Sequence, residues 1–166
     1  VGKLLYLASS CAYPRDCPQP MKPEYLMMGR LEPTNEPYAF AKLAGIVMCN
    51  AYRQQYGSNF VPCISANPYG PGDDFDPDDS HVVAALIRKV HEAGRMGATE
   101  LELWGTGNPR RDFIFVDDLA DACIFVLKTY SGEGILNAGW GKDISISEFA
   151  RAVADVAGFG GDIVFD

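Results

Sequence analysis

The stretch KLLYLASSCAYP, residues 3–14, decides the fold of this 166-residue chain. Residues 3–8 are mostly apolar, as in a strand buried in a sheet, and two serines and a cysteine follow them. The chain then predicts a helix over residues 35–56 and a second buried strand over residues 60–66. A strand, a helix and a strand in this order are typical of a parallel α/β sheet.

The predicted helix has clear signals at both of its ends. Asn35 is expected to cap it, Pro37 stands in its first turn, and Gly57 follows its last residue. Residues 12–34, which precede it, hold five prolines and predict a long loop. Loops of this length without secondary structure are uncommon and are often functional.

Strands and helices continue to alternate in the remainder of the chain. We predict a turn-rich loop over 67–80, helices over 80–95, 117–130 and 145–157, and strands over 100–104, 112–116, 134–138 and 162–165. Asp117 or Asp118 is expected to cap the second of these helices, and Ser145 or Ser147 the third. The fold class is therefore α/β.

Composition excludes several classes of protein. A formal net charge of −8 disfavours nucleic-acid binding, which needs a basic surface. Five scattered cysteines without a CxxC pair indicate neither a disulfide framework nor, with two histidines, a zinc site, and they suit a reducing cytoplasm. The apolar runs at 82–87 and 122–127 fall far short of the ~20 residues of a membrane span.

Tyr38 and Lys42 are candidates for acid–base chemistry. Their spacing of four puts both side chains on one helical face, where an ammonium favours the phenolate form of a tyrosine. Such pairs also arise by chance in many helices. Ser9 ends the first strand, where ligands bind in open α/β sheets, although a hydroxyl there can also serve only to turn the chain.

Three ordered motifs together resemble the extended short-chain dehydrogenase/reductase family. They are SSCAYP with PYAFAK (the Ser…Tyr-x-x-x-Lys pattern), then Asn67-Pro68-Tyr69-Gly70-Pro71, then RDFIFVDDLA from Arg111. The longer stretches NEPYAFAKLAGIVMCNAYRQQYG and LWGTGNPRRDFIFVDDLADA are similar to members that epimerise and reduce a GDP-linked 4-keto sugar. The resemblance therefore implies an NADPH-dependent 3,5-epimerase and 4-reductase acting on GDP-4-keto-6-deoxymannose.

The resemblance also implies roles for particular residues. Ser9, Tyr38 and Lys42 would be the catalytic group, and Cys11 and His81 would exchange protons beside the ketone, since thiols and imidazoles titrate near neutrality. Without the resemblance, Cys11 is a small buried hydrophobe and His81 a polar residue in a helix's first turn. The implied contacts with NADP(H) are Leu7, Ala8, Ser9, Ser10, Tyr38, Lys42, Ser65, Ala66, Asn67, Pro68 and His81.

A second set of residues is implied to bind the GDP-sugar substrate. Arg111 matches the ligand of the diphosphate, because a guanidinium fits phosphate with two hydrogen bonds. Trp104 matches a substrate-contacting tryptophan, or belongs to the core. Lys89 stands where arginine is common in these enzymes; together with Arg88 it otherwise forms a solvated helix face.

Two features depart from the family pattern. Ser65-Ala66-Asn67-Pro68 replaces the usual Pro-Thr-Asn-Leu, a segment whose backbone lies near the nicotinamide in the resembled family. No G-x-G-x-x-G fingerprint follows a strand, so we expect the C-terminal part of a Rossmann-type doubly wound sheet plus a small substrate-binding α/β region, with the N-terminal half of the dinucleotide fold missing. The chain is then a fragment, inactive alone.

This reading divides the chain at residue 80. Residues 1–80 would be the catalytic second half of the dinucleotide fold, and residues 81–166 the substrate-binding region interleaved with the last Rossmann elements. The small residues Ala39, Ala41, Ala44 and Gly45 permit close helix packing, either across a homodimer, as in the family, or within one subunit. The alternatives are a UDP-hexose 4-epimerase or dehydratase of the same family, and a non-catalytic relative.

Overall fold

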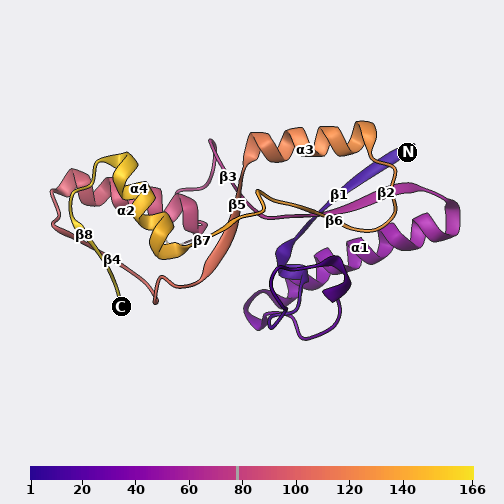
Figure 1. Ribbon diagram of the computed structural model, residues 1–166, viewed down its shortest axis with the longest axis horizontal. Coiled ribbons are helices and arrows are strands. Elements are labelled where there is room, and N and C mark those ends of the chain that lie inside the picture. The colour runs from indigo at the N-terminus through magenta and orange to yellow at the C-terminus, as the bar shows by residue number, and fades with distance from the viewer. Residues whose placement is uncertain (78) are drawn as a thin grey trace. The chain divides into compact units, whose positions relative to one another are not determined.

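A computed structural model describes residues 1–77 and 79–166 (Figure 1). The chain forms two compact units: the first comprises Val1–Pro68 and Ile114–Trp140, and the second comprises Tyr69–Phe113 and Gly141–Asp166. Strands and helices alternate along the chain, so the predicted α/β class is confirmed. The predicted loop 67–80 includes residue 78, which lies outside the described residues.

The first unit is a parallel sheet with helices on both of its faces. Its strand order is β1 (Lys3–Ser9), β2 (Asn59–Ser65) and β6 (Leu136–Ala138). Helices α1 (Glu36–Tyr56) and α3 (Val116–Thr129) lie on opposite sides of these strands (Figure 1). Burial of Ala8, Ile46 and Ile64 between strand and helix makes the core, and apolar burial of this kind is the main favourable term in folding.

A single glycine lets α1 approach the sheet closely. A Cβ atom added at Gly45 would lie 2.2 Å from Cζ of Tyr6, a side chain that projects from β1. Ala39 is likewise fully buried, whereas Ala41 and Ala44 are exposed. Two of the four small residues on this helix are therefore explained by packing within one subunit.

The proline-rich segment between β1 and α1 is more structured than the sequence predicted. It contains three short 3-10 helices, Ser10–Ala12, Pro23–Tyr25 and Pro33–Asn35. One side chain of β6 anchors it, since Asn137 accepts a hydrogen bond from the Tyr13 hydroxyl at 2.8 Å and donates one to the Met21 carbonyl at 3.0 Å. Proline disfavours regular helix and sheet, which explains why the sequence pattern gave no element here.

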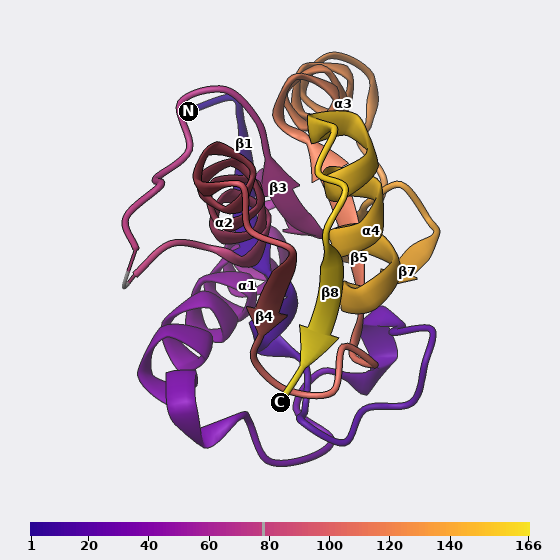
Figure 2. The ribbon, with the colours of Figure 1, turned by 90° about the vertical axis from the view of Figure 1, so that its left-hand side faces the viewer.

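The second unit pairs two helices with short strands (Figure 2). Its helices are α2 (Val82–Met96) and α4 (Ile146–Ala157), and its strand β4 (Glu100–Leu103) runs parallel to β8 (Asp162–Phe165). It also contains residues 110–113 of β5 (Arg110–Phe115), which runs antiparallel to β7 (Asp143–Ser145). The buried side chains of Leu86, Leu103 and Ala150 form its core. Helix α4 begins with a capping box between Ser145 and Glu148, so Ser145, one of the two predicted caps, is confirmed.

The two caps predicted for α3 are wrong. Helix α3 begins at Val116, so Asp117 and Asp118 lie in its first turn, where their charge stabilises the positive end of the helix instead. For α1 the predicted cap position, Asn35, is confirmed, and only the expected capping hydrogen bond of its side chain is missing. Short strands β3 (Asn67–Tyr69) and β7 were missed, because three residues carry too little periodicity.

Among the described residues, no helix combines the length and apolarity that a bilayer crossing requires.

Candidate active site

The carboxyl end of β1 carries the first candidate residues. Ser9 ends the strand, and its Oγ accepts a hydrogen bond from the backbone N–H of Cys11 at 3.3 Å. This bond is the chain-turning role that the sequence left open for Ser9. Among the residues that the structure describes, this hydroxyl only accepts, so its proton can be donated to a ligand oxygen.

Helix α1 presents Tyr38 and Lys42 on one face, as their spacing predicted. The Lys42 ammonium donates to the Leu7 carbonyl at 3.1 Å and lies 5.7 Å from the centre of the Tyr38 ring. It lies at the same distance, 5.7 Å, from the ring of Tyr6. Tyr38 is 51% exposed, so about half of the residue's surface can be reached by a ligand. One ammonium proton is donated to Leu7, and the other two make no hydrogen bond within residues 1–77 and 79–166.

Cys11 differs from the other cysteines in its surroundings. The Asn35 side-chain amide donates to its sulfur, with Nδ2 and Sγ 3.1 Å apart, and the residue is only partly buried. Burial raises the pKa of the Cys63 thiol to about 11. Burial also raises the pKa of Cys17, Cys49 and Cys123, so these four thiols stay protonated at neutral pH.

Most of the predicted cofactor contacts lie where strands end. Leu7, Ala8 and Ser9 pair in register with Cys63, Ile64 and Ser65 of β2. The Ser65 hydroxyl donates to the Ala8 carbonyl at 3.5 Å, and the Ala66 N–H donates to Ala138 at 2.7 Å. Ser10 opens the first 3-10 helix, and Asn67 and Pro68 begin β3. Ligands of open α/β sheets bind at such strand ends.

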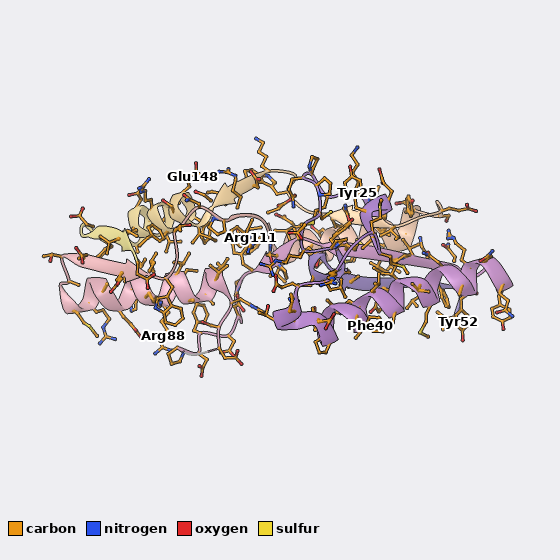
Figure 3. The ribbon with its side chains drawn as sticks, turned by 90° about the horizontal axis from the view of Figure 1, so that it is seen from below. Tyr25, Phe40, Tyr52, Arg88, Arg111 and Glu148 are labelled. Atoms are coloured by element: carbon orange, nitrogen blue, oxygen red, sulfur yellow. The ribbon has the colours of Figure 1, made fainter. Side chains whose placement is uncertain are left out.

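In the second unit, Arg111 lies on β5 (Figure 3), and the side chains of both its chain neighbours make contacts. Arg110 binds Asp143 at 3.0 Å and Glu148 at 3.2 Å, and the Asp112 carboxylate accepts from the Gly141 N–H at 3.1 Å. The hydrogen bond to Asp143, followed by the charges of Asp143 and Glu148, raises the pKa of Arg110, and hydrogen bonds with Ser145 lower the pKa of Glu148. Arg111 is exposed and bonds only the carbonyl of Arg110, at 2.8 Å, among the described residues. Most of its guanidinium is therefore available to an anion.

Lys89 and Trp104 meet in the same unit. The Lys89 ammonium lies 4.6 Å from the centre of the Trp104 ring, a cation–π contact. Trp104 is 83% exposed, so the alternative that it belongs to the core is wrong. Arg88 is half-buried and donates to the Glu92 carboxylate and the Phe75 carbonyl, so it is not a freely solvated residue of the helix face.

His81 stands at the start of α2. It is exposed, occupies the cap position, and makes no side-chain capping bond. Ser9, Cys11, Tyr38 and Lys42 thus belong to the first unit, and His81, Lys89, Trp104 and Arg111 to the second. Sequence reasoning missed the contact of Asn35 with Cys11, because asparagine before a helix is typical of a cap. Across residues 1–77 and 79–166, no group of acidic, histidine and cysteine side chains is arranged to hold a metal ion.

Comparisons with known proteins agree on one family. Its model, described as the NAD dependent epimerase/dehydratase family, matches residues 1–139. The chain is 54% identical to the GDP-L-fucose synthase of Sinorhizobium fredii over 166 residues, which are 100% of this chain and 53% of that protein. The chain spans about half the length of the curated relatives it matches.

Many solved structures are also similar to the chain, among them two that cover 100% of it. A GDP-D-glycero-L-gluco-heptose synthase from Campylobacter jejuni, crystallised in the presence of NADPH, has a TM-score of 0.89 at 34% identity, and 60% of that chain is covered. A GDP-L-fucose synthetase from Naegleria fowleri, bound to NADP, has a TM-score of 0.91 at 26% identity, with 54% covered.

Proposed function

Because this chain belongs to the NAD dependent epimerase/dehydratase family, we propose that it carries the catalytic residues of a GDP-L-fucose synthase. Such an enzyme epimerises C3 and C5 of GDP-4-keto-6-deoxymannose and then reduces the C4 ketone. The observation that carries the proposal is the gathering of Ser9, Cys11, Tyr38 and Lys42 at the carboxyl end of β1. These residues combine two proton donors for a ketone oxygen with a thiol that can exchange a proton beside it.

The residues at the strand ends suit a nicotinamide nucleotide. Lys42 keeps two ammonium protons for ribose hydroxyls after its bond to Leu7. Leu7, Ala8, Ser65 and Ala66 line the ends of two adjacent strands, where a flat ring can lie against backbone. We propose NADP(H) as the cofactor, as in two of the similar solved structures. When bound, it supplies the hydride for reduction.

Proton transfer in this proposal is divided among the chain's own residues. Cys11 and His81 remove and return protons at the carbons beside the ketone, passing through enolates. Ser9 and Tyr38 donate hydrogen bonds to the C4 oxygen, where the negative charge of the enolate develops. During reduction Tyr38 gives its proton to that oxygen, and the Lys42 charge stabilises the phenolate left behind.

The two units take different roles in the proposal. The first unit holds the acid–base residues. The second supplies contacts to the GDP-sugar through Arg111, whose guanidinium suits the diphosphate, and through Lys89 and Trp104. The chain has a formal net charge of −8, which disfavours binding of a nucleic acid. We therefore propose a small anionic substrate.

The proposal is tested by giving the intact protein GDP-4-keto-6-deoxymannose and NADPH. We expect NADPH oxidation with formation of GDP-L-fucose, and no turnover with UDP-linked hexoses. Conversion of UDP-hexoses instead would assign a UDP-sugar 4-epimerase, and no reaction with either sugar would indicate a non-catalytic relative. Residues 1–166 alone should not turn over, because they lack a glycine-rich dinucleotide fingerprint.

We also propose a homodimer formed through α1. The outer side of this helix exposes Phe40, Val47, Met48, Tyr52 and Tyr56 to 46–66%, and apolar patches of this kind mark interfaces. A charge there should weaken association, so Met48→Glu is expected to sediment as a monomer. Met96→Glu, at an exposed methionine of α2, is the control and should leave the dimer intact. A wild type that sediments as a monomer would contradict the proposal.

The cysteines bear on location. All five are free thiols in the structure. Since thiols stay reduced in the cytoplasm, we propose that location, which cell fractionation tests directly.

A further inference from the structure

We infer that Asn35 is a positioning residue for Cys11: its side-chain amide holds the sulfur and stabilises the negative charge that the sulfur carries after losing its proton. The inference deepens the proposed function, because it rests on Cys11 as the group that exchanges protons with the sugar. Nothing in the sequence pattern pointed to it, since asparagine at this position is typical of a helix cap.

The geometry gives the contact its direction. Asn35 Nδ2 lies 3.1 Å from Cys11 Sγ, and an amide nitrogen can only donate, so the sulfur is the acceptor. A donated hydrogen bond is stronger when the acceptor is charged, and it therefore favours the thiolate over the thiol. The backbone of Cys11 is held independently, through its N–H bond to Ser9 Oγ. The amide thus acts on the one part of Cys11 that the strand end does not fix.

Asn35 gives up its usual role to make this contact. It stands at the cap position of α1, yet its side chain makes no capping bond there. The preceding 3-10 helix is capped by another residue, since the Glu32 carboxylate accepts from the N–H of Thr34 at 3.4 Å. Glu32 therefore caps the 3-10 helix, and the Asn35 amide points to the Cys11 sulfur.

The other end of the amide is buried without a partner. Asn35 Oδ1 has no solvent exposure and no hydrogen-bond partner among the described residues. A buried polar atom left unpaired destabilises a fold, so it is kept where the group has another use. Here the same amide makes the sulfur contact, which accounts for an asparagine at a position where serine or threonine would cap equally well.

The contact also links the two halves of the proposed chemistry. Asn35 directly precedes α1, three residues before Tyr38, and Cys11 follows the strand that carries Ser9. A hydrogen bond between them fixes the thiol relative to the helix that carries the phenol. Loss of the bond should therefore impair proton exchange at the sugar carbons, while the Ser9, Tyr38 and Lys42 group keeps its own contacts.

The test uses the intact protein and reads the thiol directly. Iodoacetamide alkylates thiolates, and trypsin cleavage after Arg15 separates the Cys11 peptide from Cys17 for mass spectrometry. Asn35→Asp keeps the side-chain size, removes the donor and adds negative charge, so Cys11 alkylation at neutral pH should slow about 10- to 100-fold. Deuterium exchange into the sugar at C3 and C5 should slow similarly, and reduction of the pre-epimerised ketone should change less than about threefold.

Thr34→Ala is the matched control and should leave all three rates unchanged, since within the described part of the chain the Thr34 hydroxyl bonds only the Glu32 carboxylate. Asn35→Ser is the second variant, for use if Asn35→Asp does not fold. Serine is a good cap but is too short to reach the sulfur, so Cys11 alkylation should again be slower. Unchanged Cys11 alkylation in a folded variant overturns the inference. Slower alkylation in the Asn35 variants would support the Asn35 contact even if Cys11→Ser exchanged deuterium at the full rate. That second result would refute the proposed role of Cys11 in proton exchange.

Discussion

Replacing Tyr38 by phenylalanine should slow reduction of the ketone by about 10²- to 10⁴-fold, the usual contribution of a positioned general acid. The change removes one hydroxyl and leaves the ring in place, 5.7 Å from the Lys42 ammonium. Because Tyr38 is 51% exposed, the free energy of unfolding should change little. The rate is measured as NADPH oxidation with pre-epimerised ketone, so that epimerisation does not enter.

A second tyrosine of the same helix serves as the control for this change. Tyr52 is 46% exposed and lies farther along α1 than Phe40 (Figure 3), with its ring 5.6 Å from that of Phe60 near the start of β2. Tyr52→Phe removes the same atom and should leave the rate within about twofold, as surface changes usually do. Equal rates for Tyr38→Phe and wild type would remove Tyr38 from the chemistry.

The helices were the most predictable part of the fold. Helix α1 runs to Tyr56 and ends at Gly57, which takes the left-handed conformation, as the glycine signal predicted. Helix α4 and strand β8 were also predicted at almost the correct residues, because periodicity and a capping box agree there. Long amphipathic segments carry their own signal, whatever they pack against.

The short elements and the contacts across the chain were less predictable. The 3-10 helices before α1 and strand β7 depend on distant partners, such as Asn137 for the loop and Arg110 for the strand. Pairing of this kind is decided by tertiary packing, which no window of a few residues contains. Charges at helix starts were misread for a related reason, since a carboxylate suits both the cap and the first turn.

The candidate site divides along the same line. The spacing of Tyr38 and Lys42 predicted that they share a helix face, and the structure confirms that the two are neighbours. Lys42 bonds the carbonyl of Leu7, 35 positions earlier in the chain. Asn35 bonds the sulfur of Cys11, 24 positions earlier. Local spacing in the sequence cannot reveal contacts over such separations. The roles of these residues, and that of His81 in the second unit, stay predictions that only kinetics can decide.

Replacing Cys11 by serine should separate the two reactions. A hydroxyl is far less acidic than a thiol, so it cannot exchange protons with a sugar carbon near neutral pH, although it fills nearly the same volume. Deuterium incorporation from D₂O at the carbons beside the ketone should fall by about 10²- to 10⁴-fold, as expected for loss of an acid–base group. Reduction of pre-epimerised ketone should stay within about threefold, because Tyr38 and Lys42 keep their contacts.

Cys17→Ser is the matched control, since Cys17 is also a partly buried free thiol but lies in the proline-rich loop, where burial raises its pKa. It should leave both reactions at the wild-type rate. An equal loss of exchange and reduction in Cys11→Ser, with the control unaffected, would mean that the sulfur only supports the shape of the strand end. Loss of exchange alone would assign the proton transfer to Cys11, because the serine keeps the backbone bond to Ser9 that shapes this turn.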